Sequence, residues 1–224
     1  MTILNKPTIY NAPTIYKLGG GGGENPDGSI KCLGIMNCDS SHFLSIGGLT
    51  LTRLFTYEFD FLSGSGGGMF GAVWNGSGAY YNRTVSGMRD NGMFIIGGGS
   101  YGSSEYSVSG VSAGAKCKSI TKQSNNNYTF EIYKNGVLVG TNTAAITWNV
   151  VSATFLQIFK SWDNSEANCG KFTFLGLKII DPSNDTIKYN FTPAEKEGVA
   201  GVYEEITGIF YGETYHDNSI VALK

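Results

Sequence analysis

Two carboxylates with the spacing of neighbours on one strand face are the first residues that could do chemistry. Glu58 and Asp60 stand two positions apart within LTLTRLFTYEFDFL, residues 49–62. Alternate residues of a strand point to the same side, so these side chains would lie together. Paired carboxylates can serve as acid and nucleophile in glycoside hydrolysis. The next two positions after Phe61 are Leu62 and Ser63, so no further carboxylate follows. We therefore predict two solvated acids on an outer strand face and no catalytic residue.

Other catalytic patterns are equally incomplete. The two histidines, His42 and His216, lie near no serine or cysteine in a nucleophile elbow. The glycine runs at 19–23 and 97–99 lack the lysine and hydroxyl residue of a phosphate loop. The sequence therefore favours a protein that is not an enzyme and that needs no cofactor.

Three aromatic, amide-rich segments are candidates for glycan binding, which uses an exposed ring beside polar groups. They are residues 74–82, the Ser/Tyr-rich stretch 100–106, and residues 161–166. The candidate residues are Trp74, Asn75, Tyr80, Tyr81, Asn82, Tyr101, Trp162, Asp163 and Asn164. The alternative is that Trp74 and Trp162 pack in the core at strand ends.

No metal site is expected. Asp163, Asn164 and Glu166 offer oxygen atoms to calcium, but no complete binding loop surrounds them. The cysteines form no C-x-x-C pair and have no histidine nearby, which argues against zinc. They are Cys32, Cys38, Cys117 and Cys169. We expect mostly buried thiols, with one or two disulfides as the alternative.

Charge and hydropathy exclude several partners. The chain has 16 basic and 18 acidic residues and no basic block, so nucleic acid has no electrostatic attraction to it. No apolar run approaches the roughly 20 residues of a membrane span. The first residues, MTILNKPTIYN, do not resemble a secretion signal, which predicts synthesis in a cytoplasm.

Period-two alternation and glycine-rich punctuation indicate an all-β chain, a sandwich or jelly roll. Residues 49–62 predict one long strand with Phe59 and Phe61 on its covered face. Residues 128–139, YTFEIYKNGVLV, predict a hairpin about the Asn135-Gly136 turn. Further strands are expected at residues 69–74, 92–96, 115–122, 154–162, 170–180, 186–191, 199–204 and 209–211.

The N-terminus repeats one short sequence, Pro-Thr-Ile-Tyr, at residues 7–10 and 13–16. Its proline, isoleucine and tyrosine residues favour an extended chain. They are Pro7, Ile9, Tyr10, Pro13, Ile15 and Tyr16. We predict an anchoring arm over residues 1–18, a flexible glycine-rich linker over 19–29, and one β-sandwich domain over 30–224. The arm either adds to the sheet edge of another chain or pairs with its own domain.

The closing segment carries a resemblance. It contains Phe191-Thr-Pro-Ala, then Gly198-Val-Ala-Gly-Val-Tyr203, then Thr207-Gly-Ile-Phe-Tyr211. This resembles the end of concanavalin A-like (laminin-G-like) jelly rolls in bacteriophage virion proteins. The hairpin at 130–139 and the strand at 54–61 resemble others of the same superfamily. Glu204 departs from the pattern, which usually has aspartate there.

The resemblance implies a two-sheet antiparallel β-sandwich with an extended N-terminal arm. It also implies a non-enzymatic virion surface protein of the tail-fibre, receptor-binding or capsid-decoration type. The expected partners are other virion proteins through the arm, sister copies in a homo-oligomer, with a trimer favoured, and host cell-surface glycan. Some glycosidases of the superfamily place catalytic carboxylates on one strand face and need a further carboxylate two or three residues on. This chain has none at residues 62 and 63. A glycoside hydrolase or lyase, or a decoration protein without ligand, is the alternative.

Overall fold

The structure, a computed structural model, is built from β-strands throughout its described part. It describes residues 23–38, 42–52, 54–64, 68–74, 83–88, 93–98, 103–107, 114–124, 127–145, 152–159, 172–213 and 219–224. Seventeen strands and no helix occur in these ranges. In the same ranges, no helix has the length and apolar character that crossing a membrane requires.

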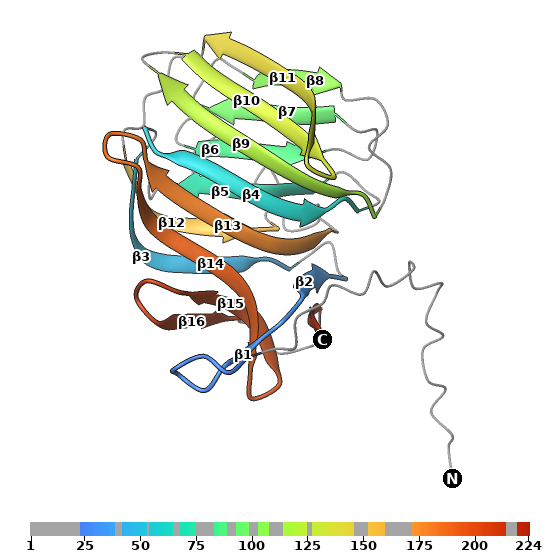
Figure 1. Cartoon of the computed structure of the whole chain (residues 1–224), viewed down its shortest axis with the longest axis vertical. Coiled ribbons are helices and arrows are strands. Elements are labelled where there is room, and N and C mark those ends of the chain that lie inside the picture. The colour runs from blue at the N-terminus through green and yellow to red at the C-terminus, as the bar shows by residue number, and fades with distance from the viewer. Residues whose placement is uncertain are drawn as a thin grey trace.

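The strands form two sheets that lie face to face (Figure 1). The path of the larger sheet is β11 (Val137–Ala145), β10 (Asn127–Lys134), β9 (Lys116–Ser124), β4 (Thr56–Leu62), β13 (Thr173–Asp181), β14 (Thr186–Lys196), β15 (Val199–Glu204) and β16 (Ile209–Gly212). The short strands β1 (Ile30–Lys31), β2 (Gly34–Asn37) and β17 (Ile220–Leu223) join it off this path. The smaller sheet has the order β3 (Leu44–Thr52), β12 (Ser152–Ile158), β5 (Gly68–Trp74), β6 (Arg83–Met88), β7 (Met93–Gly98) and β8 (Ser103–Ser107).

Each pair of neighbouring strands in the described part of the chain is antiparallel. The predicted all-β, two-sheet antiparallel sandwich is therefore confirmed.

Aromatic residues dominate the core between the sheets. The rings of Phe59 and Phe174 meet edge to face, with centroids 5.4 Å apart, and Phe159 lies 4.6 Å from Phe172. Ile46 and Leu156 contribute from the smaller sheet and are almost fully buried. A side chain of this size stabilises the fold by about 1.5–3 kcal/mol when it is fully buried. These contacts cover one face of the larger sheet and leave its other face to solvent.

The single long strand expected over 49–62 is wrong. The chain forms β3 up to Thr52 and β4 from Thr56, and the two strands belong to different sheets. A turn joins them, in which the backbone N–H of Phe55 donates to the carbonyl of Thr52. The Tyr57 hydroxyl donates to the same carbonyl at 3.0 Å. The alternation continues across the break because Leu49 and Leu51 at the end of β3 are buried in the same core as Phe59 and Phe61 of β4.

The Asn135-Gly136 hairpin is confirmed. Both residues have positive φ, 50° and 81°, as the favoured two-residue turn requires. Each of the further expected strands has a counterpart, with boundaries shifted by a few residues. The sequence reading missed β1, β2, β6, β8 and β17. Within the stretch 100–106, expected to be a loop, residues from Ser103 onward belong to β8, which pairs with β7.

The residues from Gly23 to Ser29 form a tight turn. Asn25 and Ser29 are buried and bonded side chain to side chain at 2.9 Å. The N–H of Lys31 donates to the carbonyl of Gly23 at 3.0 Å. Asp27 accepts the hydroxyl of Ser29 and pairs with Lys196 on β14 at 3.2 Å. The described end of the expected linker is thus folded onto the body, and the boundary of the arm at residue 18 stays a prediction.

Pro193 marks the point where β14 changes partner. Along β14, strand β13 pairs up to Phe191 and β1 pairs from Ala194. The Pro193 carbonyl accepts the N–H of Cys32. The N and the carbonyl of one strand residue face the same edge, so the missing N–H of Pro193 faces Cys32, just beyond β1, and not β15. Proline therefore costs no bond between β14 and β15 at this position.

Candidate functional site

The outer face of the larger sheet carries a row of charged and hydroxyl side chains from β4, β9, β10 and β13. We call it the polar strip, and its members are Glu58, Asp60, Lys116, Lys118, Lys122, Glu131, Tyr133 and Lys178. On β4 the residues between them, Phe59 and Phe61, point into the core. The same alternation of apolar and polar residues that places Phe59 and Phe61 in the core thus places Glu58 and Asp60 in the strip.

Strand register brings the strip together from distant parts of the chain. Asp60 is directly opposite Lys118, which is in turn opposite Tyr133. Glu58 is opposite Lys178 on the other side. Residues directly opposite on neighbouring strands have Cβ atoms about 5 Å apart, so these side chains interact.

Lys118 is the centre of the strip. Its Nζ lies 3.5 Å from Glu58 Oε2 and 3.5 Å from Asp60 Oδ2. Its side chain is 36% exposed, and those of Glu58 and Asp60 are 24% and 34% exposed. One ammonium group therefore serves two half-buried carboxylates, and it stays within reach of water and of a ligand.

A second charged group adjoins the first. Lys122 Nζ lies 3.3 Å from both carboxylate oxygens of Glu131. The Tyr133 hydroxyl donates to Glu131 Oε2 at 3.0 Å. This hydrogen bond fixes the phenol ring along the strip and raises the pKa of Tyr133. The strip thus offers an oriented aromatic ring beside several donors and acceptors.

The local electrostatics favour a neutral Asp60 more than is usual. Burial raises the pKa of the Asp60 carboxyl, the charge of Lys118 opposes this shift, and Glu58 adds to it. Glu58 and Asp60 were expected to be solvated acids on an outer face. They do lie on the outer face, but they are half-buried and tied to Lys118. No further carboxylate follows the pair along the chain at residues 62 and 63, which are Leu62 and Ser63.

None of the residues predicted to bind glycan has a described side chain. Trp74 is the last residue of β5, and its backbone is opposite Phe155 and Arg83. Its side chain lies outside the described residues, as do Asn75, Tyr80, Tyr81, Asn82, Tyr101, Trp162, Asp163 and Asn164. The arm residues Pro7, Ile9, Tyr10, Pro13, Ile15 and Tyr16 also lie outside them. These assignments stay predictions.

The sequence reading named Glu58 and Asp60 but missed the lysines and Tyr133. The signal was present in KCKSITK, residues 116–122, where lysine stands at positions 116, 118 and 122 of a predicted strand. Those even spacings place all three on one face. The spacing does not show which strands are the neighbours of this one, because that depends on long-range pairing.

Cysteine and metal chemistry add nothing to the site. Cys117 is buried, and burial raises its pKa to about 11. Cys32 is half-buried and Cys38 is exposed, so the expectation of a buried thiol fails for Cys38. Cys169 lies outside the described residues. No group of three or more potential metal-binding side chains occurs among the residues that the structure describes.

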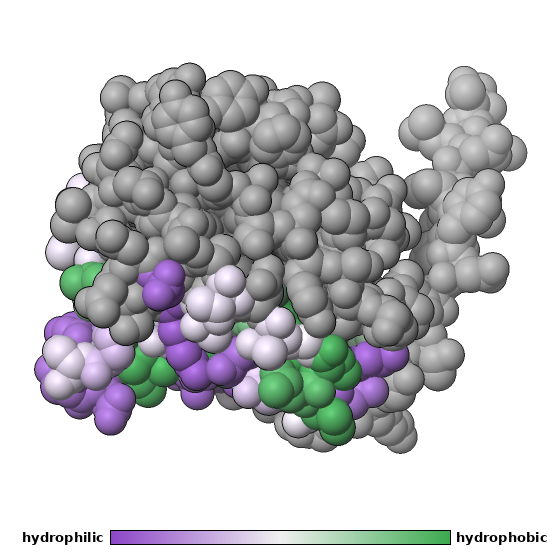
Figure 2. Space-filling view, turned by 90° about the horizontal axis from the view of Figure 1, so that it is seen from above, coloured by the Kyte–Doolittle hydropathy of each residue, from purple (hydrophilic) through white to green (hydrophobic). Residues whose placement is uncertain are grey.

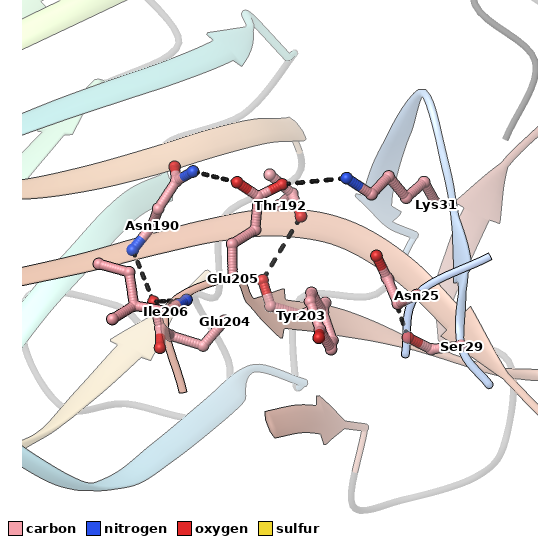
Figure 3. A network of polar contacts seen from close by, with 9 residues as sticks. All are labelled: Asn25, Ser29, Lys31, Asn190, Thr192, Tyr203, Glu204, Glu205 and Ile206. Carbon is pink, nitrogen blue, oxygen red and sulfur yellow. Dashed lines mark hydrogen bonds and ion pairs between the residues drawn. The ribbon is translucent and has the colours of Figure 1, made fainter. Parts of the chain in front are cut away.

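The segment that carried the family resemblance has a structural role (Figure 3). The Glu204 side chain is fully buried and accepts the backbone N–H groups of Asn190, Ile206 and Thr207 at 2.8, 3.2 and 2.7 Å. Glu205 accepts from Asn190 Nδ2 and pairs with Lys31 at 3.3 Å. Glu204 therefore closes the turn between β15 and β16 and fastens it to β14.

Comparisons with known proteins give partial likenesses only. No known protein-family model and no curated protein matches the chain. A putative carbohydrate binding protein from Bacteroides ovatus aligns over 87% of this chain and 61% of its own, at 14% identity and a TM-score of 0.48. A SAP-like pentraxin from Limulus polyphemus aligns over 72% and 73%, at 13% identity and a TM-score of 0.43. NanB sialidase from Streptococcus pneumoniae aligns over 68% and 26%, at 14% identity and a TM-score of 0.43. The fold assignment therefore stands on the strand topology described above.

Proposed function

We propose that this chain is a non-enzymatic, glycan-binding surface module of a bacteriophage virion. In this proposal the β-sandwich is the displayed head and residues 1–18 attach it to the particle. The observation that carries the binding role is the polar strip, in which Lys118 holds Glu58 and Asp60 beside the Tyr133–Glu131 pair. The virion setting is supported by the resemblance of the closing segment.

Sugars are recognised by hydrogen bonds to hydroxyl groups and by contact of their apolar faces with aromatic rings. The strip supplies carboxylate acceptors, ammonium donors and a phenol. Its side chains stand on strands held by the aromatic core, so little ordering cost is expected when a ligand binds.

The same geometry argues against hydrolysis. A glycosidase needs one carboxyl group to donate a proton and a separate carboxylate to attack or to activate water. Here Glu58 and Asp60 both contact the one ammonium group of Lys118, and no further carboxylate follows them at residues 62 and 63.

Binding of the full-length chain to a glycan array tests the proposal. We expect Lys118→Ala to weaken binding at least about tenfold, since it removes the donor shared by two acceptors. The matched control is Lys188→Ala, because Lys188 belongs to β14, which contributes no residue to the strip, and pairs with Asp181 at 3.6 Å. No binding to any glycan would refute the binding role. Loss on Trp74→Ala or Trp162→Ala, with Lys118→Ala unaffected, would place the ligand at the loops instead.

Two further measurements separate the alternatives. Release of reducing ends from polysaccharides, lost on Glu58→Gln, would establish the hydrolase. Mass spectrometry of purified particles would test the virion role. A chain lacking residues 1–18 should fold and yet be missing from those particles, and normal incorporation of it would show that the arm is no anchor.

A further inference from the structure

The edge strand β11 is unusually open to pairing. Among the described strands it has a neighbour on one side only, β10. It is nine residues long and ends the larger sheet. The other end of that path, β16, has four residues. A long edge strand presents a row of backbone groups with which another strand can pair.

The side chains of β11 do little to block such pairing. Its sequence, VLVGTNTAA, contains no charge and no proline, two of the usual devices that protect an edge. Val137, Leu138 and Val139 are 65%, 49% and 38% exposed. Figure 2, seen from the side of β11 and β8, shows hydrophobic residues in green close to hydrophilic residues in purple on the described surface. A bulge opposite Ile132 and Tyr133 leaves residues 140–145 in regular register with β10.

We propose that β11 is the docking strand for the N-terminal arm of a second copy of this chain. The inference names the partner of the arm within the proposed function and does not depend on glycan binding. The twice-written sequence Pro-Thr-Ile-Tyr supplies the added strand.

The length of the arm supports its assignment to β11. Residues 7–16, which hold both copies of the repeated sequence, extend over about 33 Å at roughly 3.3 Å per residue. The nine residues of β11 extend over about 30 Å by the same rule. The repeated segment is therefore about as long as the docking strand.

The even spacing between the two copies of the repeat supports this docking more strongly than the length does. The two copies start at Pro7 and Pro13, an even number of positions apart, so in an extended strand they present the same residues to the same face. The N–H groups of successive strand residues point to alternate edges. Both prolines therefore remove an N–H from one edge, and the other edge keeps the N–H groups of Thr8, Tyr10, Ala12, Thr14 and Tyr16.

An arm of this kind has one edge that can pair and one that is interrupted. The complete edge can bind β11, whereas the interrupted edge disfavours the addition of another strand. The sheet of each copy therefore gains one strand and does not widen further.

Reach favours a second copy over the chain's own arm. The described chain begins at Gly23, which is bonded to β1 beside β14. A strand added beyond β11 would lie five strand spacings from β13, or about 24 Å. Tyr16 is seven residues before Gly23, which gives about 25 Å only when fully straight. A glycine-rich coil of this length averages about 15 Å. Figure 1 shows β1 and β11 at opposite ends of the sheet.

Sedimentation equilibrium of the full-length chain over a range of concentrations tests the inference. We expect reversible self-association, which Ala12→Pro weakens at least about tenfold because it removes an N–H from the complete edge. The matched control is Asn11→Pro, which removes an N–H from the edge that Pro7 and Pro13 already interrupt, and it should associate like the natural chain.

The docking strand is tested in the same way. Val137→Lys places a charge on β11 and should also weaken association, whereas Ile187→Lys, at a residue 41% exposed on β14, should not. Circular dichroism checks that each variant is folded. A strictly monomeric natural chain, or equal loss in Asn11→Pro and Ala12→Pro, would overturn the inference. Glycan binding by Val137→Lys reports on the proposed function separately, because β11 association and the polar strip use different residues.

Discussion

The buried carboxylate of Glu204 accepts the backbone N–H of Asn190 at 2.8 Å, and so joins the turn after β15 to the middle of β14. Two further N–H groups of the turn bond to the same carboxylate. We predict that Glu204→Ala lowers the free energy of unfolding by about 3 kcal/mol, because the backbone N–H groups that bond to the carboxylate lose their acceptor. Urea denaturation measures this loss.

The neighbouring Glu205 is the control for this prediction. Its side chain is 32% exposed and pairs with Lys31 at the surface. Glu205→Ala should therefore cost less than about 1 kcal/mol. Equal losses in the two variants would contradict the assigned role of Glu204.

Gly201 packs where a side chain has no room. A Cβ built there would overlap the carbonyl oxygen of Tyr211 and the Cα of Gly212 on β16. We predict that Gly201→Ala destabilises the fold by about 2 kcal/mol, because β15 and β16 must separate. Gly47 on β3 has open space at its Cβ position, so Gly47→Ala should change the melting temperature little. A Gly201→Ala protein as stable as the natural one would show that β16 moves aside freely.

Asp27 should make stability depend on acid. The hydroxyl of Ser29, together with the Ser29 N–H and Lys196, holds the pKa of Asp27 below its ordinary value. Its stabilising effect is therefore complete above the unfolded pKa of about 3.9 and is lost as the pH falls through the folded value. We expect Asp27→Asn to lose less stability than the natural protein between neutral pH and about pH 3. Parallel stability curves for the two proteins would exclude this contribution.

Lys118 should control the titration of Asp60. The pKa of Asp60 is raised by burial, and Lys118 limits the rise. Because the folded pKa exceeds the unfolded one, the folded state takes up the proton more readily. The destabilising effect of Asp60 at neutral pH is then relieved as the pH falls through the folded value. We predict that Lys118→Ala raises the pKa of Asp60 further, as measured by NMR titration of the carboxyl carbon. Lys122→Ala, which removes the partner of Glu131, should leave it unchanged, and a fall in either variant would refute the assignment.

Local patterns in the sequence determined those features of the structure that depend only on neighbouring residues. Asn135-Gly136 specified a hairpin because both residues accept positive φ. The alternation of apolar and polar residues indicated that Phe59 and Phe61 lie in the core, because successive side chains of a strand face opposite sides. The abundance of such strands, without helical periodicity, was enough to predict an antiparallel sandwich.

Only the tertiary structure decided which strands are neighbours. Alternation continues across residues 49–62, yet the chain passes from one sheet to the other between Thr52 and Thr56, since both sheets share one core. The pairing of Asp60 with Lys118 joins strands more than fifty residues apart, and Glu204 acts on a turn and a strand at once. Such contacts depend on the packing of the whole sandwich, because sequence spacing fixes which face a side chain takes but not what lies beside it.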